Sequence, residues 1–522
     1  MNNKNKFINL FVSFITSLFL IIMFVLTGMA LFWHCKVDIN SYHLARRVEE
    51  HRPMLYILMG MSALVLLVFC CKGIMILLSR CKDERRGVYI TLAIGSACML
   101  VACAFWILFN DSVPKNDQII LFEDARILAG VAEGIPDTYY FGLYPRNKGL
   151  LLFMTLAIKI FGDTQLAFRI FNVIAALALF LFVCLTVEKA WKHAGITILT
   201  AILLVVYYPI VVYTAFLYGT LFSAALAAGG IYGTVRFCED KDIGGILLFA
   251  ICFPMAILMH QSALIACIAS LFYIMIHFSK KYFMKMIIML GMTLCIYLGS
   301  GQIIDYIYEA EAGIVPVDAV PALAWVYMGI TSENADGGPG AQDGSFIQLF
   351  MENDSDAKLT NREALNRIKT VVSEYVRGER DWNFFVEKIK YQWLDPTFGA
   401  RKTIVTNDTS IGEPANSPRY LTFFHSGIRD VIFRLFIVYM VVVYSLNLLV
   451  GCKQFGKGET HKLHFLIQIL LLGGFTFQLI WESLSRYCFP YFVWLIPEAA
   501  YGVYYMYTYI SLHLKSRKKS NV

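Results

Sequence analysis

The chain has 522 residues, of which 58% are hydrophobic and only 16% are charged, and its mean hydropathy is +0.60. Soluble domains carry about 25% charged residues, so this composition excludes an ordinary soluble protein and predicts an integral membrane protein. The net charge of +7 is modest and gives no reason to expect a nucleic-acid partner.

The first apolar run extends from Phe7 to Trp33 and follows Lys4 and Lys6. A secretory signal has an apolar core of roughly 7–15 residues, whereas roughly 20 apolar residues cross a bilayer. We therefore predict a retained first span. The same length rule predicts twelve spans, near residues 7–33, 54–79, 88–109, 166–187, 195–212, 217–235, 243–259, 261–278, 284–303, 430–451, 463–483 and 489–513.

The apolar run 149–161 is too short to span, and we predict that it lies along the outer membrane surface. With that choice the lysine-rich short loops fall on the cytoplasmic side, together with both chain ends. The lysines of these loops are Lys189, Lys192, Lys280, Lys281, Lys285, Lys453, Lys457 and Lys462. The link between the first two spans disagrees with this charge pattern, because its basic residues lie on the outer side of the membrane. These residues are Lys36, Arg46, Arg47 and Arg52.

Two long polar segments are predicted to lie outside, at residues 110–165 and 302–429. In the second, Thr360 and Glu363 have the spacing of a capping box, and apolar residues follow at helical spacing. A second amphipathic helix is predicted at Trp382–Trp393, and a Gly- and Asp-rich loop at Asn334–Ser345.

These features predict four regions in an all-α multi-pass membrane protein. Residues 1–86 form an N-terminal hairpin of two spans. Residues 87–303 form the catalytic membrane module, whose first outer loop is 110–165. Residues 304–429 form the large extracytoplasmic loop, and residues 430–522 form the C-terminal spans.

Metal and redox chemistry receive little support from the residues. Most of the 13 cysteines sit in apolar runs, and no Cys/His spacing typical of a zinc site occurs. Asp354 and Asp356 form a DxD string, which binds metal and nucleotide in some soluble glycosyltransferases. No nucleotide is expected outside the membrane, so we interpret the string as a chance match. We predict no cofactor and leave a divalent metal open.

The first outer loop contains the groups best suited to chemistry. Asp117 lies just outside the membrane, before a predicted short helix at Ile119–Glu133. The stretch Tyr144-Pro-Arg-Asn-Lys-Gly149 brings Arg146 and Lys148 to the head of the interfacial helix. Such cations can hold a lipid phosphate, and a carboxylate can deprotonate a hydroxyl. The competing interpretations are a solvated aspartate and an ordinary interfacial anchor.

The order of several short motifs resembles the polyprenyl-phosphate-sugar-dependent glycosyltransferases of the GT-C fold. This superfamily includes the protein O-mannosyltransferases and the aminoarabinose transferases of lipid A, and the likeness is strongest to its Gram-positive bacterial members. The motifs are Asp117-Gln118 before a helix with Ala125 and Ala129, the stretch 144–149, Lys159-Ile-Phe-Gly162, Arg169 with Asn172, Phe216-Leu-Tyr218-Gly219, Trp325-Val-Tyr-Met-Gly329, Trp393-Leu-Asp-Pro-Thr-Phe398 and Ser485-Arg486-Tyr487-Cys-Phe-Pro490.

The resemblance implies a GT-C bundle in the cell membrane, with its active site on the extracytoplasmic face. A sugar would move with inversion from a polyprenyl phosphate to a protein, cell-wall polymer or glycolipid. Asp117 would be the catalytic base. The remaining implied roles are donor-phosphate binding by Lys148, Arg146, Arg486 and His260, and lining of the substrate pocket by Gln118, Tyr144, Asn147 and Tyr218. The sugar is not identified, because Gln118 stands where some members carry a second acid, a double proline is absent and two extra spans precede the family core.

Two other functions fit parts of the pattern. A lipid-linked oligosaccharide polymerase or ligase also has many spans and a large outer loop, but it would rely on Arg and His residues of that loop and need no aspartate in the first one. A transporter would place ionisable groups at mid-membrane in broken helices. Here the spans are nearly free of charge at mid-depth, which argues against transport.

Overall fold

The computed structural model describes residues 3–37, 45–110, 114, 116–277, 280–313, 318–400, 427–455 and 462–520. Each predicted span corresponds to a helix or a pair of helices in this part of the chain. They are α1 (Asn3–Phe32), α2 (Pro53–Arg80), α3 (Glu84–Phe109), α7 (Gln165–Trp191), α8 (Ala194–Val206) with α9 (Pro209–Val212), α10 (Thr220–Asp240), α11 (Ile243–Met259), α12 (Ala263–Ile276), α13 (Phe283–Ala312), α20 (Gly427–Gln454), α21 (Lys462–Ile480) and α22 (Phe489–Ser520).

Eight helices in the described part of the chain are long and apolar enough to cross a membrane, and α8 with the helical turns that follow it gives a ninth candidate, bent by 52°. This confirms an all-α multi-pass membrane protein. The predicted total of twelve also needs α11 and α12, which have 17 and 14 residues, and α22, which has 32. These three are not among the candidates by length and hydropathy.

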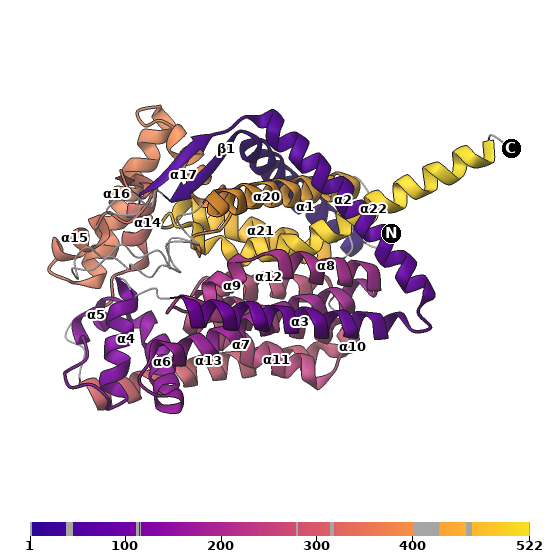
Figure 1. The fold of residues 1–522 in the computed structure, drawn as a ribbon. Helices are drawn as coiled ribbons and strands as arrows, with labels where there is room; N and C mark the ends of the chain where they lie inside the picture. Colours follow the sequence, from indigo (N-terminus) through magenta and orange to yellow (C-terminus); the bar gives the residue numbers. More distant parts are fainter. Residues whose placement is uncertain are drawn as a thin grey trace.

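The polar segments gather at one end of the bundle (Figure 1). The first outer segment forms α4 (Asp117–Leu128), α5 (Thr138–Leu143) and α6 (Lys148–Phe161), and the second forms α14 (Ala322–Thr331), α15 (Ser345–Met351), α16 (Ala357–Arg377) and α17 (Asn383–Trp393). Both chain ends lie at the opposite end of the bundle (Figure 1). The arrangement agrees with both outer segments facing one side, and the position of α6 in the membrane interface stays a prediction.

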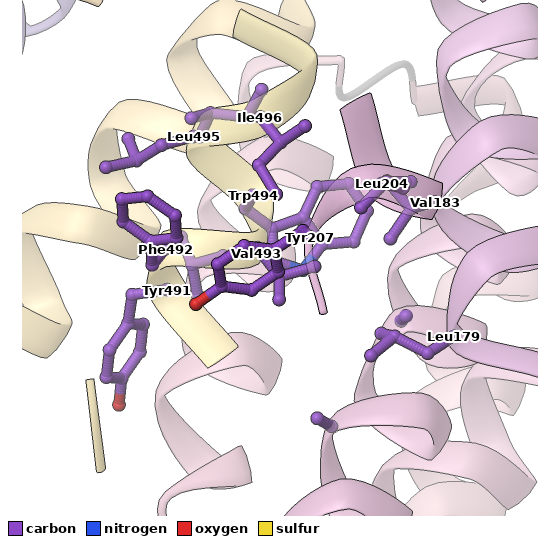
Figure 2. Packing of buried hydrophobic residues seen from close by; sticks show 14 of the residues in the cluster. Leu179, Val183, Leu204, Tyr207, Tyr491, Phe492, Val493, Trp494, Leu495 and Ile496 are labelled. Atoms are coloured by element: carbon purple, nitrogen blue, oxygen red, sulfur yellow. The ribbon is translucent and has the colours of Figure 1, made fainter. Parts of the chain in front are cut away.

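Close packing holds the bundle together. A Cβ on Gly233 of α10 would lie 2.7 Å from the Phe249 nitrogen of α11, and one on Gly245 would lie 2.6 Å from the Phe237 nitrogen. Small residues therefore let these two backbones approach, as in other membrane helix pairs. Figure 2 shows a second contact region, where side chains of α7, α8 and α22 meet around the fully buried Tyr207.

The N-terminal hairpin is part of the bundle, because α1 packs on α20 and α21 while α2 packs on α20 and α22. Its two helices are joined through strands β1 (Trp33–Val37) and β2 (Arg46–Glu50), which pair antiparallel. Arg46 is buried and donates hydrogen bonds to the carbonyl oxygens of Gly337 and Ser483. Arg46 therefore ties this link to the outer segment that contains Gly337 and to the segment that follows α21.

The structure corrects several predicted boundaries. The helix at 357–377 is capped by Asp356, whose carboxylate accepts from the backbone nitrogens of Lys358 and Leu359. The proposed capping box was wrong, because Thr360 lies one turn inside the helix. The second amphipathic helix is confirmed as α17. Residues 334–345 are not only a loop, since Glu333–Asn334 (β3) and Gly338–Pro339 (β4) pair as a short hairpin.

Two further boundaries differ. Helix α13 continues to Ala312, past the predicted end of its span at residue 303. Helix α4 begins at Asp117 and ends at Leu128, instead of running from 119 to 133. Residues 111–113 and 115 of the first outer loop, 401–426 of the second, and Lys457 lie outside the described residues.

Candidate active site

Asp117 occupies the first turn of α4, so it lies at a helix N-terminus instead of in a loop. It is half-buried and makes no hydrogen bond or ion pair to the described residues. The partial positive charge of a helix N-terminus stabilises a carboxylate there. The unpaired charge of Asp117 acts on the hydroxyls of Tyr140, Tyr144 and Tyr218 and raises the pKa of each.

The backbone around Tyr218 is held from two sides. The Gln118 side-chain oxygen accepts from the Leu217 nitrogen at 3.0 Å. Asn172 of α7 donates to the Phe216 carbonyl oxygen at 2.8 Å. Both polar side chains are buried, so these bonds are costly to leave unmade. Gln118 thus positions the segment that carries Tyr218, and two motifs far apart in the sequence are joined.

The charge of Asp117 acts on two tyrosine hydroxyls of the first outer segment, those of Tyr140 and Tyr144. Asn147 donates to the Tyr140 hydroxyl at 2.8 Å. Burial raises the pKa of Tyr140 and of Tyr144, and the Asp117 charge raises both further. These hydroxyls stay protonated and can donate hydrogen bonds to a substrate. The Tyr144 ring also lies 6.1 Å from the Trp325 ring, which links the first outer segment to α14.

Arg486 lies in the short 3-10 turn Ser485–Tyr487 between α21 and α22. Its guanidinium carbon lies 5.1 Å from the ring centre of Tyr218 and 5.3 Å from that of Tyr487. Its buried Nε has no hydrogen-bond partner among the described residues, and its Nη2 lies 3.5 Å from the Tyr487 hydroxyl. Such a guanidinium has donors left for an anion.

Arg146 and His260 belong to the same group of side chains. The guanidinium carbon of Arg146 lies 5.8 Å from the Trp481 ring centre. Burial lowers the pKa of His260 to about 3, and the charges of Arg486 and Arg146 act in the same direction. His260 is therefore neutral at physiological pH. Its Nδ1 pairs with the Ser262 hydroxyl at 2.7 Å, and its ring lies 5.4 Å from that of Tyr487.

Lys148 lies apart from these cations. Its Nζ pairs with Asp305 of α13 at 2.8 Å and lies 5.0 Å from the Tyr308 ring centre. The Lys148 side chain is 7% exposed and that of Asp305 is 56% exposed, so the ion pair joins a buried lysine of α6 to a solvent-exposed carboxylate of α13. The prediction that Lys148 binds the donor phosphate stays a prediction, and it requires this pair to open.

Glu482 is a site residue that the sequence reasoning missed. It is 5% exposed, and its Oε2 accepts from the Tyr487 hydroxyl at 2.9 Å. Asp117 raises the pKa of Tyr218 and of Glu482, whereas Arg486 lowers both. Asp117 and Arg486, which carry opposite charges, therefore act on the same two side chains, Tyr218 and Glu482. An acid four residues before Arg486, at the end of an apolar run, was the signal available in the sequence.

Two motifs of the large loop attach it to this site. Asp395 is buried and accepts from the Ser485 hydroxyl at 2.9 Å and from the Thr397 and Gly399 nitrogens. Lys388 donates to the carbonyl oxygens of Gly329 and Trp481. These contacts fix the turn that carries Arg486. Among the described residues, none of them involves Asp117.

A narrow cavity extends from Arg486 into the bundle. Its polar lining includes Thr220, Ser223, His260, Ser262, Arg486 and Tyr487, near the outer ends of α10, α11, α12 and α22. Its apolar lining, one or two turns deeper, includes Leu179, Ala224, Ala227, Ala266, Leu470 and Trp494. Such a shape suits a ligand with a charged head and an apolar tail.

No metal site accompanies these groups in the part of the chain that the structure describes, where no three His, Cys, Asp or Glu side chains are grouped to hold an ion. Of the DxD string, Asp356 caps α16, which gives it a structural role.

The arrangement combines an unpaired carboxylate, tyrosine donors, two arginines and an apolar cavity. Residues 149–304 match the model of a family described as dolichyl-phosphate-mannose-protein mannosyltransferase. The matched segment runs from α6 into α13 and includes Tyr218 and His260, whereas Asp117 and Arg486 lie outside it. Comparisons with curated proteins and with solved structures found no match.

Proposed function

We propose that the chain, a membrane glycosyltransferase of the GT-C fold that takes its sugar from a polyprenyl phosphate, transfers this sugar with inversion to an acceptor hydroxyl on the extracytoplasmic face of the cell membrane. The acceptor is a protein, a cell-wall polymer or a glycolipid. The family match and the helical multi-span fold support the donor class and the reaction class. The residues of the site support the roles below.

Asp117 acts as general base. It accepts the proton of the acceptor hydroxyl while the hydroxyl oxygen forms a bond to the anomeric carbon. The bond between that carbon and the phosphate oxygen breaks, and its electron pair leaves with the lipid phosphate. A single displacement inverts the anomeric centre and needs one carboxylate only. The unpaired, half-buried state of Asp117 at a helix N-terminus supports this role.

Arg486 and Arg146 receive the negative charge of the phosphate. Charge-assisted hydrogen bonds from guanidinium to phosphate are strong and directional. The observation that carries the proposal is that a buried Nε of Arg486, without a partner among the described residues, lies at the polar end of an apolar cavity. The first isoprene units occupy that cavity once it widens, because as it stands the cavity has room for about one water molecule. His260 is neutral, so it can donate or accept a hydrogen bond at the phosphate without adding charge.

The test is transfer in vitro by purified protein from a panel of undecaprenyl-phosphate hexoses, with the acceptor analysed by mass spectrometry of envelope material. We expect release of undecaprenyl phosphate together with a mass increase on the acceptor. Arg486→Ala should raise the donor KM at least tenfold, as expected for loss of charge-assisted bonds. Transfer from a nucleotide sugar alone, without the lipid, would refute the proposal.

A further inference from the structure

Glu482 is a buried carboxylate that the proposed reaction does not use. Its Oε2 accepts from the Tyr487 hydroxyl at 2.9 Å, and this hydroxyl lies 3.5 Å from Nη2 of Arg486. The three side chains therefore form a relay in which Tyr487 stands between a carboxylate and a guanidinium. Arg486 and Tyr487 both contribute to the lining of the cavity.

The burial of Glu482 calls for an explanation, because a buried charge is costly unless it is paired. Glu482 forms no ion pair with the described residues. Its hydrogen-bond partner is the neutral Tyr487, and the charges of Arg486, Arg46 and Lys388 interact with it through space. Burial raises the pKa of Glu482. The charge of Arg486 and the hydrogen bond from Tyr487 lower this pKa, whereas the charge of Asp117 raises it. The Glu482 carboxylate thus interacts with Arg486 both through space and through the Tyr487 hydroxyl. Any anion that binds Arg486 is therefore repelled by the Glu482 charge.

We propose that Glu482 is a positioning residue that weakens the hold of Arg486 on the lipid phosphate, so that the phosphate leaves after transfer. This inference rests on the donor-binding role proposed above for Arg486. Its physical basis is that two negative charges near one guanidinium compete for the same positive charge, and they do so more strongly in a low-dielectric site than in water. A product held too tightly would slow turnover.

The experiment measures binding of undecaprenyl phosphate to the purified full chain, together with kcat and donor KM. Glu482→Gln removes the charge but keeps an oxygen that can accept from Tyr487. We expect roughly tenfold tighter binding of undecaprenyl phosphate, a lower donor KM and a lower kcat. A purely structural role would not tighten binding.

Two controls separate charge from hydrogen bonding. Tyr487→Phe removes the hydroxyl and keeps the Glu482 charge, so binding of undecaprenyl phosphate should not tighten. Glu374→Gln makes the same chemical change on α16, where Glu374 pairs with Arg380, and should leave binding and turnover unchanged. If Glu482→Gln is not recovered folded, Glu482→Met in the Tyr487→Phe background gives the same comparison against Tyr487→Phe alone.

The outcomes separate this inference from the proposed function. If the wild-type chain binds undecaprenyl phosphate and Glu482→Gln binds it no more tightly, the role of Glu482 is overturned and the donor class stands. If the wild-type chain binds no undecaprenyl phosphate, the proposed function fails, and the inference fails with it.

Discussion

Replacement of Asp117 by Asn gives the sharpest test of the mechanism, because its effects on activity and stability should differ widely. Loss of a general base typically costs 10²–10⁴-fold in rate, or about 3–5 kcal/mol of transition-state stabilisation. Asp117 makes no hydrogen bond to the described residues. The variant therefore loses only its interaction with the N-terminus of α4, worth about 1 kcal/mol at most.

The assay compares kcat for transfer with thermal unfolding of the purified protein and with binding of undecaprenyl phosphate. We expect kcat to fall at least 100-fold while the unfolding midpoint and the lipid affinity change little. Glu123→Gln is a matched control on the same helix, because Glu123 is exposed and pairs with Arg126, and it should retain full activity. Full activity of Asp117→Asn would refute the base assignment.

Three further predictions concern structure, pH and topology. Arg46→Met should lower the free energy of unfolding by about 3 kcal/mol or more, because two buried carbonyl oxygens lose their donor; an unchanged unfolding midpoint would contradict this. His260 has a pKa of about 3, so it should not titrate between about pH 5 and about pH 8. The activity profile of His260→Gln should then keep the wild-type shape, and a limb near pH 6.5 that this variant abolishes would show that the imidazole titrates. In a chain without its other exposed cysteines, Ser373→Cys should react with an impermeant maleimide from outside, whereas Cys452 should react only after permeabilisation; the reverse pattern would invert the topology.

The relation between sequence and site is clearest at Arg486. A cation after a long apolar run is visible in the sequence, and its place at the outer mouth of the last helix pair followed from span lengths alone. Tyr487 is the neighbour of Arg486 in sequence, but the contact of the guanidinium with the Tyr218 ring required the fold, because Tyr218 precedes α10 whereas Arg486 lies between α21 and α22. Glu482 went unnoticed for the same reason, since an acid at the end of a span looks like an ordinary interfacial residue.

Lys148 shows a contact that the sequence did not reveal. Its position beside Arg146 in one short motif suggested that both cations face one ligand. In the structure a 3-10 turn at Pro145–Asn147 precedes α6, so neighbouring side chains diverge, and Lys148 meets Asp305 from α13. Residues close in sequence lie on the same face of an element only when their spacing matches its repeat, as at i and i+4 in a helix or at i and i+2 in a strand.

The amino-acid sequence by itself determined the membrane class, the helical architecture and the order of the spans, because apolar length and loop charge act locally and the bilayer reads them without reference to distant residues. Only the tertiary structure decided which charges stay unpaired. Arg46 and Lys148 found partners on other segments, whereas the Asp117 carboxylate and the Arg486 Nε have none among the described residues. The physical reason is that an ion pair depends on which helix ends meet, and this is fixed by packing across the whole bundle.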